Sequence, residues 1–269
     1  MAALSPLLTI MIRAAEKAGR VLVRDFGEIE QLQVSRKGPA DFVTAADKRS
    51  EEIIFEELKK AKPDFSFLME ESGEVKGNDP ENIWIIDPID GTHNFMHGIP
   101  HWCISIALQS KGKVIAGVIY DPAKDELFYA EKGTGAFLRG NKRLRASGRN
   151  QLEGCVISTG YGGLDSQRHD QFISEFDKVI TQAPMIRRMG AAALDLAYVA
   201  AGRLDGYFER HIKPWDVAAG ILLVREAGGM VSSIDDGADP VYSKNIIAAN
   251  NQIHGDLLKL LKSAKQKAA

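Results

Sequence analysis

The composition of the chain is that of an ordinary globular protein. Its 269 residues are 45% hydrophobic and 26% charged, which suits one large domain or two moderate domains that share an interface. Lys and Arg number 34 against 36 Asp and Glu, for a net charge of -2, and no block of basic residues occurs. Direct binding to nucleic acid is therefore not expected, because a sequence-independent electrostatic grip needs such a block.

The sequence carries no signal for export or for a membrane. Its start has no charged segment followed by an apolar stretch, and no apolar run reaches the ~18 residues of a membrane helix. A cytoplasmic protein without membrane contact is expected. The two cysteines, Cys103 and Cys155, indicate neither a disulfide framework nor a thiolate metal cage, so both are expected to be buried apolar residues.

The first half of the chain changes from a helical to a strand period. Apolar residues recur every three or four positions over residues 4–26, which predicts an amphipathic helix ended by Gly27, and a second helix is expected over about residues 45–61. Short β-rich segments punctuated by Gly, Pro or Asp then follow, at residues 65–69, 82–87, 102–109, 114–120 and 126–131. They predict a meandering sheet, with a further hairpin turning at Gly140 and Asn141.

The second half alternates strands and helices. The polar stretch 147–154 is the best candidate boundary, which divides the chain into an α+β domain (residues 1–146) and an α/β domain (residues 147–269). Strands are expected at residues 155–159, 185–188, 206–210, 230–234 and 246–249. Helices are expected near residues 169–180, 191–201, 217–227 and 253–261.

Residues 84–94 (Trp-Ile-Ile-Asp-Pro-Ile-Asp-Gly-Thr-His-Asn) contain the densest pattern of functional residue types. Pro88 cannot continue a sheet ladder, so the preceding strand should end at Asp87, facing a cleft. Gly91 lets Asp90 turn back toward the same cleft, and Thr92 adds a hydroxyl and a free backbone N–H. Oxygen-only ligands favour a hard ion such as magnesium. The alternative is a turn whose aspartates bond local amides.

Two other acidic segments favour the metal site over that alternative. Glu70 and Glu71 directly follow the strand expected at residues 65–69, although in isolation they would be read as a solvated loop. Asp216 stands where the helix over residues 217–227 begins, and taken alone it would be read as a helix cap. Together with Asp87 and Asp90, these residues make a shared carboxylate site the better interpretation.

The motifs together resemble those of the inositol monophosphatases, within the lithium-sensitive, magnesium-dependent phosphatase superfamily. Residues 87–92 followed by Asn94 and Phe95 look like the first signature of the family. Residues 215–220 (Trp-Asp-Val-Ala-Ala-Gly) with residues 226–229 (Glu-Ala-Gly-Gly) look like the second. The resemblance spans nearly the whole chain. It implies a layered αβαβα sandwich, of the type shared with fructose-1,6-bisphosphatase, and a homodimer that hydrolyses phosphomonoesters.

The resemblance also implies a role for each carboxylate. Glu70, Asp87 and the carbonyl of Ile89 would bind a first magnesium ion, and Asp87, Asp90 and Asp216 would bind a second. A third, weaker ion would share Glu70 and be completed mostly by water, which gives two to three ions per site. Paired ions stabilise the attacking and leaving oxygens of an in-line displacement. The catalytic residues implied are Glu70 with Asp47 and Thr92, the last two orienting the attacking water.

The substrate contacts follow from the same resemblance. The phosphate would lie over the backbone N–H groups of Gly91 and Thr92, and Asp90 and Asp216 would also belong to the substrate-binding residues. Glu209, seven residues before Asp216, matches a hydroxyl-binding glutamate, and the segment of Gly190, Ala191 and Ala192 resembles a sugar-contacting loop. Lys37 matches a family lysine on a loop near the metals. Read alone, Lys37 would be an ordinary surface residue.

Three residues depart from the family pattern. His93 stands where a second threonine is common, Met69 replaces a glycine before the glutamate pair, and Ala191 replaces a serine or threonine. None of these changes removes a metal ligand, and a structural role within the first helical turn is preferred for His93 over a titrating one. The loss of a hydroxyl at Ala191 leaves the identity of the alcohol open.

Other functions remain compatible with the pattern. The substrate could be myo-inositol 1-phosphate, fructose 1,6-bisphosphate, a nucleotide 3'-phosphate, NADP or histidinol phosphate. Residues 190–202 and 214–229 also look like a bacterial member of the family associated with transcription antitermination complexes and ribosomal RNA maturation. In that case the protein would act through contacts with other proteins, as a regulatory partner.

Overall fold

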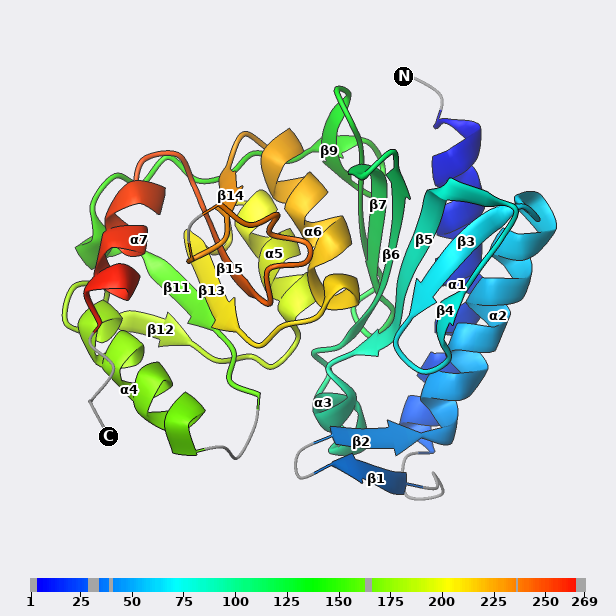
Figure 1. Ribbon diagram of the computed structural model, residues 1–269, viewed down its shortest axis with the longest axis horizontal. Coiled ribbons are helices and arrows are strands. Elements are labelled where there is room, and N and C mark those ends of the chain that lie inside the picture. The colour runs from blue at the N-terminus through cyan, green and yellow to red at the C-terminus, as the bar shows by residue number, and fades with distance from the viewer. Residues whose placement is uncertain (1–3, 29–33, 39–40, 163–165, 236, 265–269) are drawn as a thin grey trace.

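Helices and sheets alternate in layers across the molecule. The computed structural model describes residues 4–28, 34–38, 41–162, 166–235 and 237–264. Along the long axis of Figure 1 the order is α1 with α2, an eight-stranded sheet, α5 with α6, a five-stranded sheet, and α4 with α7. This arrangement confirms the predicted αβαβα sandwich.

The first layer consists of the two helices predicted at the N-terminal end of the chain. They are α1 (Pro6–Gly27) and α2 (Ala45–Ala61). The hydroxyl of Ser5 accepts a hydrogen bond from Leu8 N and caps α1, which has a proline in its first turn. The buried residues of α1 recur at helical spacing, so this helix covers the sheet with one face.

The eight-stranded sheet contains the predicted meander. In sheet order its strands are β10 (Lys142–Arg143), β9 (Gly135–Leu138), β8 (Glu126–Glu131), β7 (Lys113–Asp121), β6 (Cys103–Ser110), β5 (Asp79–Asp90), β3 (Phe65–Met69) and β4 (Gly73–Val75). Successive strands from β5 to β10 pair antiparallel, while β3 pairs parallel with β5. Successive side chains of β5 point to opposite faces of the sheet. Trp84 and Ile86 pack in the hydrophobic cluster shared with α1 and α2, and Ile85 packs in the cluster shared with α5 and α6.

The prediction that this strand ends at Asp87 is wrong. β5 continues through Pro88 to Asp90, and its register with β6 shifts between Asp87 and Asp90. A proline lacks the N–H that a regular ladder needs, so an irregular stretch is the place where a strand accommodates it. The extension carries both aspartates on one strand end.

The second sheet is mixed. Its order is β12 (Met185–Arg187), β11 (Val156–Thr159), β13 (Gly206–Arg210), β15 (Asn245–Ala249) and β14 (Met230–Ser232). β11 pairs parallel with β12 and with β13, and the other pairs are antiparallel. The helices of this half are α4 (Ser166–Ile180), α5 (Ala192–Ala200), α6 (Pro214–Glu226) and α7 (His254–Ser263). All lie where helices were predicted, with ends that differ by a few residues.

The central helices belong to one buried core with both sheets. Ile85 and Cys103 of the first sheet share a buried cluster with Leu194 of α5 and Leu223 of α6. A Cβ added to Gly117 would lie 3.1 Å from the backbone of Ala219, so α6 approaches β7 closely. The division into residues 1–146 and 147–269 stays a prediction, and the apolar core is continuous across it.

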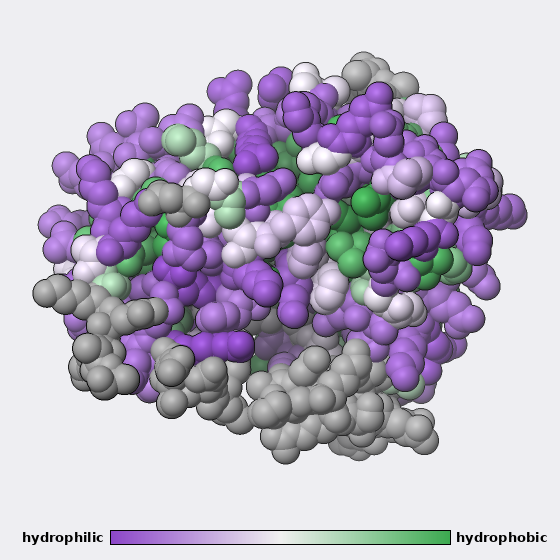
Figure 2. All heavy atoms as spheres, in the orientation of Figure 1, coloured by the Kyte–Doolittle hydropathy of each residue, from purple (hydrophilic) through white to green (hydrophobic). Residues whose placement is uncertain are grey.

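Some elements were not predicted from the sequence. A hairpin of β1 (Val34–Gly38) and β2 (Asp41–Thr44) precedes α2, and a short helix α3 (Thr92–Met96) follows β5. The two cysteines are buried and free, as expected. Within the described ranges, none of the helices is long and apolar enough to cross a membrane. The face of the molecule in Figure 2 is mainly hydrophilic, with small separated apolar areas.

Candidate active site

A cavity of about 470 Å³ is lined by residues from both halves of the chain. Its acidic lining residues are Glu70, Asp87, Asp90, Asp195, Glu209 and Asp216. Ile89, Gly91, Thr92, Gly190, Ala191 and Ala192 line it as well. The cavity therefore brings together most of the site residues predicted from the sequence.

Neighbouring strand ends deliver Glu70 and Asp87 to the cavity. Glu70 directly follows β3, which runs parallel to β5, so the two carboxyl ends lie at the same edge of the sheet. The backbone N–H of Glu70 donates to the carbonyl of Ile86 at 3.3 Å. Asp87 is buried, and its Oδ1 accepts the N–H of Ile89 at 3.0 Å. These contacts fix the backbone at Glu70 and orient the carboxylate of Asp87.

Asp90 connects the two halves of the site. Its Oδ2 accepts the N–H of Ala193, in the first turn of α5, at 2.6 Å. The thiol of Cys103 lies 3.8 Å from the same oxygen. The side chain is buried, so this carboxylate is held by groups from β6 and from α5 at once.

The turn at Gly91 requires a glycine. Its φ of 93° lies in the left-handed region, and a Cβ there would be 3.0 Å from the carbonyl of His101 and 3.2 Å from Ala191 Cβ. Thr92 then begins α3, and its hydroxyl donates to the carbonyl of Ile89 at 3.0 Å. A carbonyl oxygen has two lone pairs, so this bond leaves Ile89 one further acceptor position.

Asp216 lies in the first turn of α6, two residues after Pro214. Lys213 is the N-cap, so Asp216 is close to the cap position, as expected, and acts as the third residue of a capping box. Its Oδ2 accepts the N–H of Lys213 at 2.8 Å. The hydroxyl of Ser105, on the strand beside Asp87, donates to the carbonyl of Trp215 at 3.2 Å. This contact fixes the start of α6 against the first sheet.

The carboxylates raise one another's pKa values. Burial, with further repulsion from Asp216 and Asp47, raises the pKa of Glu70 to about 9. Burial and the charges of neighbouring carboxylates also raise the pKa of Asp87 and of Asp90 well above their usual range. A cation held among these groups would offset both effects, and carboxylate and carbonyl oxygens suit a hard ion. The residues present therefore fit a divalent metal.

The metal-ligand set itself stays a prediction. Among the residues that the structure describes, no three His, Cys, Asp or Glu side chains already form a group that could hold a metal ion. The carboxylates nevertheless line a single cavity. Asp47 lies in the first turn of α2, buried, behind the lining residues. It is close enough to Glu70 and Asp87 to raise the pKa of each.

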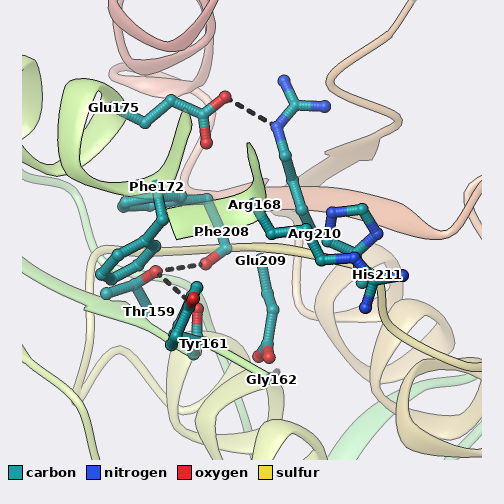
Figure 3. Close-up of a pocket in the computed structure, with 11 residues that line it drawn as sticks. Thr159, Tyr161, Gly162, Arg168, Phe172, Glu175, Phe208, Glu209, Arg210 and His211 are labelled. Carbon is teal, nitrogen blue, oxygen red and sulfur yellow. Dashed lines mark hydrogen bonds and ion pairs between the residues drawn. The ribbon is translucent and has the colours of Figure 1, made fainter. Parts of the chain in front are cut away.

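Glu209 forms the opposite wall of the cavity. Its Oε2 accepts a hydrogen bond from the hydroxyl of Tyr207, and a Cβ added to Gly160 would lie 1.9 Å from that oxygen. Figure 3 shows the Glu209 carboxylate pointing toward Gly162, while Arg210 points the other way, to Glu175. Burial, with the nearby charges of Asp216 and Asp195, raises the pKa of Glu209 to about 8.

The loop before α5 is held in place by Asn94. The amide nitrogen of Asn94 donates to the carbonyls of His101 and Met189, each at 2.8 Å. Gly190 has a φ of 85°, and Ala191 is buried just before the helix. This contact between α3 and the loop was not predicted, because it joins residues far apart in the sequence.

Another missed residue is Asp195. It is buried, lines the cavity, and its Oδ2 accepts the hydroxyl of Ser158 at 2.7 Å. A single carboxylate within the otherwise apolar helix α5 is the sequence signal that could have indicated it. His101 Nε2 lies 3.8 Å from the other oxygen of Asp195.

The remaining predicted residues lie as follows. His93 belongs to the first turn of α3, as expected, and its exposed side chain lines the cavity. Met69 is buried at the end of β3. Lys37 lies on β1, and its side chain is outside the described part of the structure, so its role stays a prediction.

The layered fold and the carboxylate cavity define this chain as a phosphatase of the metal-dependent class. A sequence model of the inositol monophosphatase family matches residues 3–266, and the chain belongs to that family. It is 52% identical over 258 residues to an inositol-1-monophosphatase of Mesorhizobium japonicum, covering 96% of this chain and 97% of that protein. It is 44% identical over 248 residues to the Nus factor SuhB of Escherichia coli, covering 92% of each.

Solved structures agree with the family assignment. The extragenic suppressor protein SuhB of Bartonella henselae superposes with a TM-score of 0.93 at 54% sequence identity. The match covers 97% of this chain and 100% of the SuhB chain. An inositol monophosphatase from Anabaena gives a TM-score of 0.85 at 38% sequence identity, and the match covers 97% of this chain and 96% of that one. The fold is therefore that of the inositol monophosphatases.

Proposed function

We propose that the protein hydrolyses myo-inositol 1-phosphate to myo-inositol and phosphate, with two to three magnesium ions per site. The observation that carries the proposal is the cavity in which Glu70, Asp87, Asp90 and Asp216 lie beside the Gly91–Thr92 turn. Relatives that are 49 to 52% identical carry the name inositol-1-monophosphatase, which supports this substrate.

Each group of residues has a distinct task in this reaction. Magnesium held by Glu70, Asp87, Asp90, Asp216 and the carbonyl of Ile89 would lower the pKa of the attacking water and offset charge on the phosphate. Asp47 and Thr92 orient that water. The N–H groups of Gly91 and Thr92 bind the phosphate oxygens. No covalent phosphoenzyme is required, because water attacks phosphorus directly.

The alcohol is recognised on the opposite wall. The carboxylate of Glu209 accepts hydrogen bonds from substrate hydroxyls, and the loop of Gly190, Ala191 and Ala192 contacts the ring. Asp195 lines the same cavity as Glu209, and its charge adds to burial and to the charge of Asp216 in raising the pKa of Glu209. A wall with two carboxylates favours a polyol over an anionic group, because hydroxyls donate hydrogen bonds and a second phosphate would be repelled.

Replacement of one carboxylate proposed to bind metal tests the assignment. Asp90→Asn should lower magnesium-dependent phosphate release by on the order of 100-fold or more, because it removes a charge that acts on the transition state. Asp170→Asn makes the same change on an exposed face of α4 and should leave the rate unchanged. An active Asp90→Asn protein that needs no metal would contradict the proposal.

A panel of substrates separates inositol phosphate from the alternatives. Phosphate release is measured with myo-inositol 1-phosphate, fructose 1,6-bisphosphate, a nucleotide 3'-phosphate, NADP and histidinol phosphate, each with magnesium and with added lithium. We expect the inositol ester to give the highest kcat/KM and lithium to inhibit. A higher value for any bisphosphate would contradict the polyol assignment of the Glu209 wall.

A second candidate function is regulatory. The 44% identity to the Nus factor SuhB of Escherichia coli supports a role as a regulatory partner. The resemblance drawn from the sequence implies transcription antitermination and ribosomal RNA maturation as its setting. We propose that such a role would use protein contacts, with a homodimer as the working unit, because the net charge of -2 does not favour direct binding to RNA. Pull-down of the native protein at physiological salt would recover transcription factors, and sedimentation would give the mass of a dimer.

A further inference from the structure

One face of α2 carries polar side chains beyond Asp47. Ser50 and Glu51 follow Asp47 by three and four residues, so the three side chains share a face of the helix. All three are buried against the sheet. Buried polar groups require hydrogen-bond partners, so the partners of Ser50 and Glu51 show what this face of the helix contacts.

Ser50 contacts the irregular end of β5. Its hydroxyl donates to the carbonyl of Pro88 at 2.9 Å, and the bond is buried. Pro88 lies between Asp87 and Asp90, where the register with β6 shifts. Regular strand pairing is interrupted there, so the hydrogen bond from α2 fixes the backbone that carries both aspartates.

Glu51 contacts the turn that carries Glu70. Its carboxylate oxygens accept the N–H of Glu71 at 2.8 Å and the N–H of Ser72 at 2.9 Å. They also accept the hydroxyl of Ser72. Hydrogen bonds to an ionised carboxylate are about twice as strong as neutral ones, and here they hold the two residues that directly follow Glu70.

We propose that Ser50 and Glu51 are positioning residues for the metal site. α2 holds the Glu70 turn and the segment between Asp87 and Asp90 at a fixed separation, in opposition to the mutual repulsion of these carboxylates. Outer contacts of this kind commonly set metal affinity, because they determine how far ligands must move on binding. The inference rests on the proposed function, since it assumes that these carboxylates bind magnesium.

Three variants of α2 test the inference in the full-length protein. Glu51→Gln keeps the size of the side chain but replaces one acceptor oxygen with an amide NH2 group. That group faces the backbone N–H donors of Glu71 and Ser72 and cannot accept their hydrogen bonds. Magnesium affinity, measured by calorimetric titration without substrate, should fall about 10- to 100-fold. Ser50→Ala should weaken magnesium binding in the same direction by a smaller factor. Glu52→Gln makes the same chemical change on the exposed side of α2 and should bind magnesium as the wild type does.

A second readout separates positioning from general stability. The melting temperature is measured in chelator and at saturating magnesium. A loss of stability that does not depend on metal lowers both values, so it does not affect the difference between them. A positioning role predicts that Glu51→Gln shrinks this difference and raises the magnesium concentration for half-maximal phosphate release, while kcat at saturating magnesium is largely regained. A purely structural role would lower both melting temperatures equally.

The outcomes that overturn the inference are distinct from those that overturn the function. Wild-type magnesium affinity in Glu51→Gln would overturn the positioning role. If that variant does not fold, Ser50→Ala and Ser72→Ala take its place, and unchanged affinity in both would overturn it. A wild-type protein that binds magnesium but releases no phosphate would overturn the proposed function alone, and one that binds no magnesium would overturn both.

Discussion

The carboxylate of Glu209 lies against a glycine, which limits where it can point. Gly160 follows β11 and has no side chain to occupy the space that the Glu209 oxygens take. Tyr207 lies on the same strand as Glu209, β13, and its hydroxyl donates a hydrogen bond to one of the Glu209 oxygens. The absence of a side chain at Gly160 thus leaves room for the carboxylate that is proposed to bind substrate, on another strand.

Gly160→Ala should therefore impair substrate binding. The new Cβ would lie 1.9 Å from Glu209 Oε2, so the carboxylate must move and lose its hydrogen bonds to substrate hydroxyls. Loss of hydrogen bonds to a charged group costs about 1.5–3 kcal/mol, which is roughly a 10- to 150-fold rise in KM. Steady-state kinetics would measure KM and kcat separately.

Gly162→Ala is the matched control for that substitution. It lies two residues further along the same segment, where a Cβ would meet no atom of the described residues within 4 Å. Its kinetics should remain close to those of the wild type. An unchanged KM in Gly160→Ala would show that Glu209 is not fixed in this position during binding.

At the scale of elements, α6 places Asp216 relative to both sheets. Its first turn carries Asp216, and at its other end the carboxylate of Glu226 accepts the N–H groups of Gly133 and Gly135, each at 2.8 Å. Gly133 lies in the turn between β8 and β9, and Gly135 is the first residue of β9. The helix is therefore anchored to the first sheet at both ends, although it belongs to the second half of the chain.

Gly220→Ala should disturb the packing of α6 on α5. A Cβ at Gly220 would lie 2.5 Å from Leu196 Cβ, and overpacking of this kind costs about 1–3 kcal/mol of unfolding free energy. That cost should exceed the gain of up to about 1 kcal/mol that alanine brings to a helix interior. In α7, a Cβ at Gly255 would meet no atom of the described residues within 4 Å, so Gly255→Ala should be neutral or stabilising. Urea unfolding of both variants would measure the difference, and equal stabilities would contradict close packing at Gly220.

How far the sequence predicted the structure depends on the range of the interaction. The helices α1 and α2 and the strands β3 and β8 follow from local periodicity, and their predicted positions are confirmed. The end of β5 was missed because a proline usually stops a ladder, whereas here an irregular register accommodates it. The contacts of Asn94 and of Glu51 depend on tertiary packing between distant segments, which no local pattern contains.

The site residues also divide into those that local sequence motifs indicate and those that depend on tertiary structure. The acidic motifs indicated which side chains matter, and the structure brings Glu70, Asp87, Asp90 and Asp216 to one cavity. Which oxygens bind a metal stays a prediction, because ligand geometry depends on the ion as well as on the chain. Asp195 was overlooked because a helical period was sufficient to explain its segment.

For the whole molecule, the carboxylates of the cavity form a concentration of negative charge inside a nearly neutral chain. The net charge is -2, yet six acidic side chains line one cavity. The pKa values of Glu70 and Glu209 are raised to about 9 and about 8, chiefly by burial. Without metal, the folded protein therefore binds protons at neutral pH that the unfolded chain has already released.

This difference in proton binding predicts how stability depends on pH. A carboxyl whose folded pKa is raised binds more protons in the folded state, so the free energy of unfolding falls as pH rises between the unfolded and folded pKa values. That window extends from about pH 4.5 to about pH 9 for Glu70, and from about pH 4.5 to about pH 8 for Glu209. Burial lowers the pKa of His254, which acts in the opposite direction below about 6.5. In chelator, the melting temperature should therefore fall as pH rises from about 7 to about 8.

Two comparisons assign this pH dependence to the cavity. Saturating magnesium should reduce or reverse the fall, because an ion that binds ionised carboxylates competes with their protons. Glu209→Gln removes one of the titrating carboxyl groups of the cavity, so its melting temperature in chelator should fall less steeply than that of the wild type. Differential scanning calorimetry at matched ionic strength would measure all three slopes. A wild-type melting temperature in chelator that rises over this interval would mean that the carboxylates are already ionised in the folded protein, and that the cavity holds its charges without a cation.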